Sequence, residues 1–293
     1  MSDAAARSLR EGFTLIELSI VLVIIGLLVG GVLVGRDLIV AAQVRQQISQ
    51  IEKYNTAVHT FQLKYNCLPG DCKNAADFGF PARGPNPGEG DGDGVLQGIG
   101  ANGGQEGAGE LVMFWVDLSM AGLINEQYNT ASSTVLPGGI ITPSSTPSVD
   151  AFFPKANIGQ GNYVYVWSGG IGNGTQWAPA SIFNDGKNYF GIQAVGFVQN
   201  GEMLGVNEGL GVSIPVWQAY NIDQKIDDGI PFSGKVTAML LNGGPRYALT
   251  TNQYWVDINY CVYQPGYVGT GFYNMAGANN GTAPVCALSF EFQ

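Results

Sequence analysis

The chain has 293 residues, a formal net charge of −10 at pH 7 and a sequence pI near 4.4. An acidic surface repels phosphate backbones, so this charge argues against a nucleic-acid-binding protein. Only 12% of the residues are charged while 43 are glycine, a composition that favours loops and polar-faced strands over a helical bundle. The length fits one membrane helix followed by one globular domain with a single core.

The first predicted element is an apolar run from Phe13 to Gly35 that contains one charged residue, Glu17. A helix of these 23 residues would be about 35 Å long, enough to cross a hydrocarbon core of about 30 Å. The run exceeds the length of an ordinary signal core, so we expect it to be retained. Arg7 and Arg10 precede it, and the positive-inside rule therefore predicts a cytoplasmic N-terminus and translocation of the remaining chain.

A short motif marks the start of this run. Gly12 is followed by Phe13, Thr14, Leu15, Ile16 and Glu17 and then by the apolar residues. This motif resembles the class III signal of type IV prepilins and type II secretion pseudopilins. The resemblance implies that residues 1–12 are a leader, which a membrane prepilin peptidase removes after Gly12, and that the new N-terminal residue, Phe13, is methylated.

The resemblance also implies an assembly role for Glu17. In the family, the carboxylate at this position pairs with the N-terminal amine of a neighbouring subunit. The implied partners are homologous pilin subunits, the prepilin peptidase and, before assembly, the inner membrane. Physical chemistry leaves one alternative, which is that Glu17 extends to the lipid headgroups, because an ionised side chain inside a membrane needs either a partner or access to the interface.

Small residues in the apolar run predict close helix packing. Gly26 with Gly30, and Gly31 with Gly35, have the small-x-x-x-small spacing that lets helices approach each other in a membrane. The family often has a proline at the position of Val34, and its absence here means that any kink must come from the glycines.

Residues 36–66 are predicted to continue as an amphipathic stalk helix. With the apolar run, this helix would comprise 54 residues and extend about 80 Å. His59 has no catalytic partner near it in the pattern and is expected on the helix surface, and Pro69 with Gly70 follows the end of the helix. The apolar positions recur mostly every three or four residues and are Ile39, Val44, Ile48, Ile51, Tyr54, Val58, Phe61 and Tyr65.

The cysteines fall into two local groups, Cys67 with Cys72 and Cys261 with Cys286. Four cysteines allow three pairings, and the short segments enclosed by each group favour pairing within the groups. Zinc ligation is the alternative, but Pro69 and Gly70 interrupt the first spacing and the sequence has a single histidine. Disulfides would place the domain outside the cytoplasm.

An acidic loop suggests calcium as a cofactor. Glu89, Asp91 and Asp93 alternate with glycine before Gly94 and Leu96, which resembles the first two-thirds of a calcium loop. The glutamate that completes an EF-hand loop is missing, because Gly100 stands at its position; Glu106 or Glu110 could supply a ligand from elsewhere. The alternative is that this Asp/Gly run is only a solvated loop.

Residues 67–293 are expected to form the globular domain. A buried helix at 110–122 containing Trp115, and a second helix opened by Ser213-Ile-Pro215 and ended by Asp227-Asp228-Gly229, follow from capping and apolar spacing. We expect the stalk helix to lie across an antiparallel sheet, which gives an α+β, pilin-like fold. The predicted strands are 163–167, 189–198, 235–241 and 247–251.

The sequence therefore predicts a structural protein. It has one histidine, no nucleophile beside a base and no phosphate-binding loop, so we do not expect an enzyme. The expected function is a subunit of a type IV pilus-like filament, first in the inner membrane with a periplasmic domain and then in a periplasmic or extracellular filament. The alternatives are a type II secretion pseudopilin, a minor tip pilin that acts as an adhesin through its Cys261–Cys286 loop, and an anchored domain that never polymerises.

Overall fold

The structure is a computed structural model with two compact units, Met1–Gln43 and Val44–Gln293, which are described separately. Gly12, Ser213, Glu106 and the predicted strand 247–251 lie outside the residues that the structure describes. The described residues are 13–99, 108–135, 138–168, 186–199, 202–205, 214–238, 261–263, 271–277 and 279–292.

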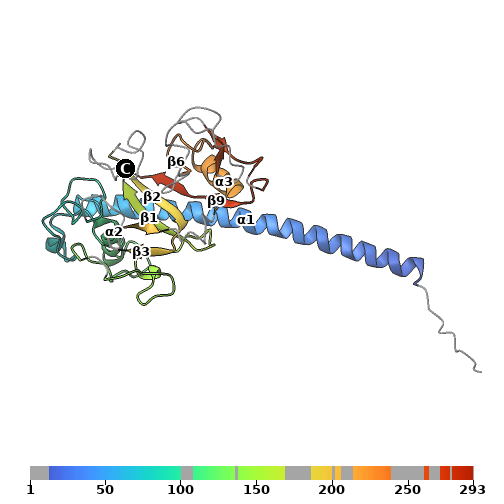
Figure 1. Cartoon of the computed structure of the whole chain (residues 1–293), viewed down its shortest axis with the longest axis horizontal. Coiled ribbons are helices and arrows are strands. Elements are labelled where there is room, and N and C mark those ends of the chain that lie inside the picture. The colour runs from blue at the N-terminus through green and yellow to red at the C-terminus, as the bar shows by residue number, and fades with distance from the viewer. Residues whose placement is uncertain are drawn as a thin grey trace, which may run out of the picture. The chain divides into compact units, whose positions relative to one another are not determined.

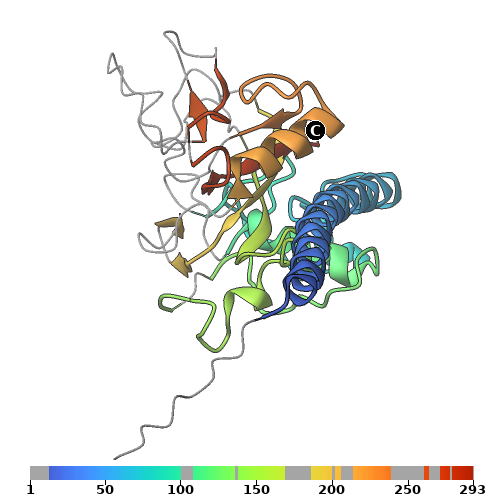
Figure 2. The same ribbon diagram turned by 90° about the vertical axis from the view of Figure 1, so that its right-hand side faces the viewer.

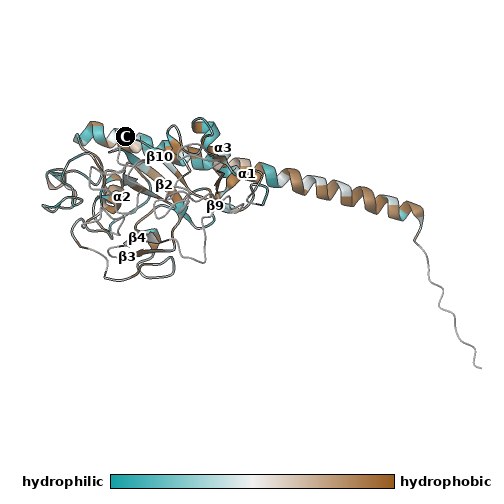
Figure 3. Cartoon of the chain, turned by 45° about the horizontal axis from the view of Figure 1, so that its top comes forward, coloured by the Kyte–Doolittle hydropathy of each residue, from teal (hydrophilic) through white to brown (hydrophobic). Residues whose placement is uncertain are grey.

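Helix α1, Leu15–Tyr65, is the longest element and confirms the predicted helix. Its first part, in unit Met1–Gln43, is mostly apolar, and Figure 3 shows this stretch mainly in brown with a hydrophilic patch near its start. From Phe13 to Val34 the large apolar side chains are exposed, and by length and composition the helix could cross a membrane. Ile39, predicted on the buried stripe, is also exposed, and the buried stripe instead begins at Val44.

In the second unit, the remaining part of α1 packs on α2, Glu110–Met120, and on the central sheet (Figure 1). The Tyr54 ring lies 5.0 Å from the Trp115 ring and 6.1 Å from the Phe190 ring, which joins helix, helix and sheet in one core. His59 is exposed on α1, as predicted. Buried α1 residues recur every three or four positions and are Val44, Gln47, Gln50, Ile51, Tyr54, Ala57, Val58 and Phe61.

The central sheet is antiparallel and has the order β1-β2-β10-β6. Its β-branched and aromatic residues suit a pleated surface buried by helices. Gly191 on β2 faces Tyr165 on β1, and a Cβ at Gly191 would lie 2.2 Å from the tyrosine ring, so the pairing requires glycine there. The strands are β1, Asn162–Ser168; β2, Asn188–Ala194; β6, Val236–Thr237; and β10, Leu288–Glu291.

Short strand pairs and one more helix complete the described domain. The pairs are β3, Phe197–Gln199, with β4, Glu202–Gly205; β5, Ile214–Pro215, with β9, Pro284–Cys286; and β7, Val262–Tyr263, with β8, Phe272–Tyr273. Helix α3, Val216–Ile226, contacts β9 and β6, and it is the orange helix in Figure 2. Single 3-10 turns occupy Ala75–Phe78 and Val149–Ala151.

Two sequence predictions need correction. Pro215 is not in the first turn of α3: it pairs with Pro284 as an extended residue, and the helix begins at Val216. The predicted strand 189–198 is interrupted after Ala194, so that its two halves join different sheets. The α+β architecture, with a long N-terminal helix before an antiparallel sheet domain, is confirmed.

Candidate functional site

The N-terminal end of α1 carries a capping box formed by Thr14 and Glu17. The Thr14 amide and hydroxyl donate to Glu17 Oε2 at 2.8 and 2.7 Å, and the Glu17 amide donates to Thr14 Oγ1 at 3.3 Å. These reciprocal bonds satisfy amides that a helix start otherwise leaves free. They direct the Glu17 carboxylate toward the N-terminal end of the helix, one turn from Phe13. The T-x-x-E spacing was visible in the sequence, but the capping role was not predicted from it.

The glycines of the apolar run have no packing role within the described chain. A Cβ built on Gly26, Gly30, Gly31 or Gly35 meets no described heavy atom within 4 Å. The described part of the chain therefore gives no packing reason for glycine at these positions. Their predicted role in helix–helix packing concerns contacts with other molecules.

An acidic cluster lies at the opposite end of α1, between the turn after the helix and the start of α2. One carboxylate oxygen from each of Asp71, Asp91 and Glu110 lies within 4.8 Å of the others. The sequence pattern does not point to Asp71, because this residue precedes the acidic loop and lies inside the turn bounded by Cys67 and Cys72. Glu110 is one of the two residues that the sequence offers as a ligand from outside the loop.

The predicted set of Glu89, Asp91 and Asp93 is only partly brought together. Glu89 Oε2 instead accepts from the backbone amide of Asn86 at 3.0 Å, which closes a local turn. Asp93 Oδ1 accepts from the amide of Val95 at 2.8 Å. Both side chains therefore serve their own loop, and Asp91 alone of the three belongs to the cluster.

Two buried carboxylates hold the acidic loop by its backbone. Asp71 accepts from the amides of Gly92 at 2.6 Å and Gly94 at 2.8 Å. Glu110 accepts from the amides of Gly90 at 2.9 Å and Gln97 at 2.8 Å. The three glycines have positive φ, a conformation that other residues adopt at a cost. The backbone conformation of the loop therefore explains the glycines between the acidic residues.

The electrostatics of this cluster favour carboxylates that are either protonated or bound to a cation. Burial raises the pKa of Asp71 to about 6, against the opposing effect of its amide donors. Burial, together with the charge of Asp71, raises the pKa of Glu110 to about 8. Three close carboxylates repel one another when ionised, and hard oxygen ligands of this kind suit calcium.

A second acidic group, at the end of α3, is occupied by structural hydrogen bonds. Asp223 accepts from the Tyr273 hydroxyl at 2.7 Å and from the Gly229 amide at 3.1 Å. Asp228 accepts from the Ser233 hydroxyl at 2.6 Å. These contacts agree with the predicted role of the aspartates at a helix end that runs into a turn.

Both disulfides form as predicted. Cys67 pairs with Cys72 at a Cα–Cα distance of 5.3 Å, and Cys261 pairs with Cys286 at 4.9 Å. All four cysteines lie in the described part of the chain, which leaves no free thiol. The alternative of zinc ligation by these cysteines is therefore not adopted.

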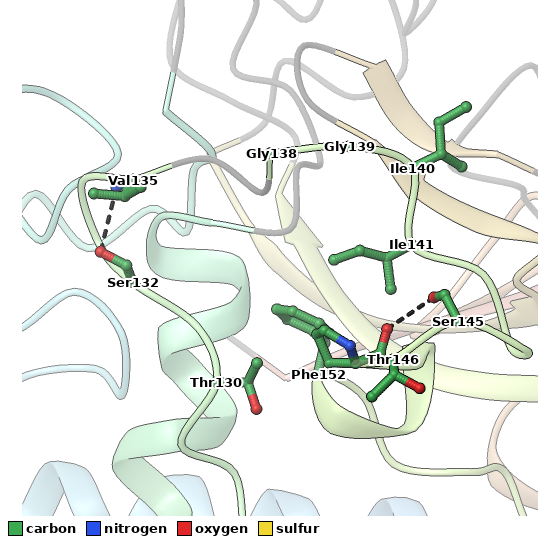
Figure 4. A pocket seen from close by; sticks show the side chains of 11 residues that line it. Thr130, Ser132, Val135, Gly138, Gly139, Ile140, Ile141, Ser145, Thr146 and Phe152 are labelled. Atoms are coloured by element: carbon green, nitrogen blue, oxygen red, sulfur yellow. Dashed lines mark hydrogen bonds between the residues drawn. The ribbon is translucent and has the colours of Figure 1, made fainter.

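A cavity of about 390 Å³ opens under the loop that precedes β1 (Figure 4). Phe152 and Ile141 line its inner side, and the more exposed Ile140 and Val135 lie at its rim. Its lining contains no ionisable side chain among the described residues. The polar side chains of this lining are the hydroxyls of Thr130, Ser132, Ser145 and Thr146.

Comparison with known families matches residues 7–33 to the prokaryotic N-terminal methylation motif. This motif is typical of type IV pilins and pseudopilins and marks a prepilin-type site of cleavage and methylation. No curated protein and no solved structure matches the chain.

Proposed function

We propose that the chain is a subunit of a type IV pilus-like filament, cleaved after Gly12 and polymerised through its N-terminal helix. The observation that carries this proposal is the methylation motif at residues 7–33, which overlaps the exposed apolar part of α1. An exposed helix surface with so many large apolar side chains needs lipid or other helices to cover it. Membrane insertion before assembly and helix packing afterwards supply these two environments in turn.

The geometry of Glu17 supports an assembly role for its carboxylate. The capping box orients this carboxylate toward the end of the helix at which cleavage would create the Phe13 amine. Within a single subunit, Thr14 is the hydrogen-bond partner that keeps the Glu17 carboxylate in this orientation before assembly. In a filament, an amine from a neighbouring subunit would add a charge-assisted bond, which is stronger than a bond between neutral groups.

Two more specific functions are compatible with this proposal, and a third function is its rival. A pseudopilin would form a periplasmic filament for secretion, and a minor pilin would sit at a tip and bind a surface through its Cys261–Cys286 region. The third, an anchored domain that never polymerises, would make no use of Glu17 beyond insertion. No observation on the globular domain favours one of the first two, and we therefore propose only the filament subunit.

The test compares Gly12→Leu and Glu17→Leu with the wild type in a cell that has a prepilin peptidase. Mass spectrometry of the N-terminus reports cleavage and methylation, and electron microscopy reports filaments. We expect Gly12→Leu to stay uncut and Glu17→Leu to be cut but not assembled. Glu52→Gln, an exposed carboxylate on the same helix, is the matched control and should assemble normally. Normal filaments from the uncut Gly12 variant would refute the proposal.

A cation is the second part of the proposed function. Asp71, Asp91 and Glu110 are the residues that would hold it, and calcium is the ion that fits an all-oxygen set. A bound calcium ion would offset two of the three negative charges and fix the loop that Asp71 and Glu110 already hold. Its role is thus structural, to stabilise the domain outside the cell.

A further inference from the structure

The turn that Cys67 and Cys72 enclose is a buried junction rather than a surface loop. It begins two residues after α1 ends at Tyr65, and residues 68–72 are buried. Among the described residues, one backbone hydrogen bond lies within the turn itself: the Asp71 amide donates to the Leu68 carbonyl at 3.2 Å. Its shape must therefore be held by the disulfide and by contacts with other segments.

Those contacts reach two separate parts of the domain. The Gly70 amide donates to Asp117 Oδ2 on α2 at 2.7 Å. Gly70 also packs so closely on α2 that a Cβ there would lie 2.3 Å from the Glu110 carbonyl oxygen. The next residue, Asp71, is 2% exposed and turns its carboxylate onto the amides of Gly92 and Gly94. One disulfide-closed turn thus joins the end of α1, helix α2 and the acidic loop.

We propose that the Cys67–Cys72 pair is a redox latch: its oxidation positions Asp71 to hold the acidic loop at Gly92 and Gly94, and its reduction releases that loop while the remaining core stays folded. Closing the turn removes many of its alternative conformations, which favours the one in which Asp71 reaches both amides. Leu68 and Cys72 pack into the core of the domain, but the ring contacts of Tyr54 with Trp115 and Phe190 involve no residue of the turn.

The chemistry of the latch is thiol–disulfide exchange. The Cys67 and Cys72 thiols lose two protons and two electrons as the S–S bond forms, and a disulfide oxidant takes up both and becomes a dithiol. The location of this step rests on the proposed function, since translocation would move the turn from a reducing to an oxidising compartment. The acidic loop would then become ordered only after export.

Hydrogen exchange of the purified full chain in detergent tests the latch without any filament. Chelator is present throughout, so that metal does not contribute. We expect Cys67→Ser/Cys72→Ser to increase exchange at the Gly92 and Gly94 amides by about tenfold or more, and amides of β1 and β2 to stay protected. Cys261→Ser/Cys286→Ser is the matched control, because it removes the other disulfide and should leave the acidic loop unchanged.

Asp71→Asn keeps both disulfides and separates the latch from general destabilisation. It should increase exchange at the Gly92 and Gly94 amides to the same extent as the cysteine variant. Combining the two changes should increase exchange little further, because both remove the same contact between Asp71 and these amides. Unchanged exchange in Asp71→Asn would overturn the proposal, even if the cysteine variant failed to fold. A uniform loss of protection over the whole domain in Cys67→Ser/Cys72→Ser would overturn it as well. Failed filament assembly with an intact latch would count against the proposed function alone.

Discussion

The guanidinium of Arg83 forms an ion pair with Asp117 in the interior of the domain, where the two side chains are 2% and 0% exposed. The same Asp117 oxygen accepts the Gly70 amide, so the pair connects the Pro/Gly-rich segment before the acidic loop to α2 and to the disulfide-closed turn. Burial raises the pKa of Asp117 although Arg83 acts to lower it. The charge on Asp117 therefore depends on its partner.

Removing Arg83 should be strongly destabilising. In Arg83→Met the Asp117 carboxylate keeps its burial but loses its countercharge, and breaking such a pair costs about 3–5 kcal/mol. Lys187→Met is the matched control: its bond to Glu291 is 2.9 Å long but lies at the surface, where a pair is worth about 0–1 kcal/mol. Chemical denaturation of the full chain in detergent measures both. Equal losses in the two variants would contradict the assignment of Arg83 to the core.

Gly191 should tolerate no side chain. In Gly191→Ala the new methyl would meet the Tyr165 ring, whose hydroxyl donates to Gln193 at 3.2 Å on the same strand as Gly191. Moving the ring or the strand typically costs about 1–3 kcal/mol. Gly139→Ala, where a Cβ meets no described atom within 4 Å, should have a near-zero effect. A thermal midpoint of Gly191→Ala equal to that of Gly139→Ala would show that β1 and β2 pair differently.

Calcium should stabilise the domain through a particular set of carboxylates. At a calcium concentration of 100 times the dissociation constant, the gain is about 2.7 kcal/mol. Chelator should remove this gain in the wild type, whereas Asp71→Asn and Asp91→Asn should not respond to calcium. Asp93→Asn should still respond, because Asp93 bonds within its own loop. If calcium changes no thermal midpoint, the cation proposal fails, while the roles of Asp71 and Glu110 in holding the loop stay as described.

With chelator present, the stability of the domain should depend on pH in a definite direction. The pKa of Glu110 rises from 4.5 to about 8 on folding, so the folded state binds more protons than the unfolded state between these values. Stability should therefore fall as the pH rises from about 4.5 to 8 and level off above 8. Glu110→Gln should flatten this slope, and calcium should oppose it, since calcium prefers the ionised carboxylates. A wild-type stability that rises across this range in chelator would contradict the raised pKa.

The sequence predicted those features that depend on local patterns. The periodicity of α1, the buried Trp115 helix and the aromatic strand β1 each follow from spacing within one segment. The pairing of cysteines within their local groups is of the same kind. For these features, tertiary structure agrees with local preference.

The sequence was less informative where distant segments meet. Asp71, from the turn after α1, and Glu110, from the first turn of α2, come together only through the fold, and the alternating carboxylates drew attention to Glu89 and Asp93 instead. Pro215 has a local preference for a helix start, but pairing of β5 with β9 places it in a strand, so tertiary contacts override that preference.

Thr14 should matter for assembly through its hydroxyl. Thr14→Val keeps the size and the amide but loses the donor to Glu17 Oε2 and the acceptor of the Glu17 amide, whereas Thr14→Ser keeps both. Without the capping box, the Glu17 side chain samples other rotamers and points less often to the end of the helix. We expect both variants to be cut after Gly12 and Thr14→Val to give several-fold fewer filaments than Thr14→Ser. N-terminal mass spectrometry and filament counts by electron microscopy provide the measurement. Equal yields from the valine and serine variants would show that the hydroxyl does not orient Glu17 for assembly, and a loss of cleavage in Thr14→Val would instead assign Thr14 to recognition by the peptidase.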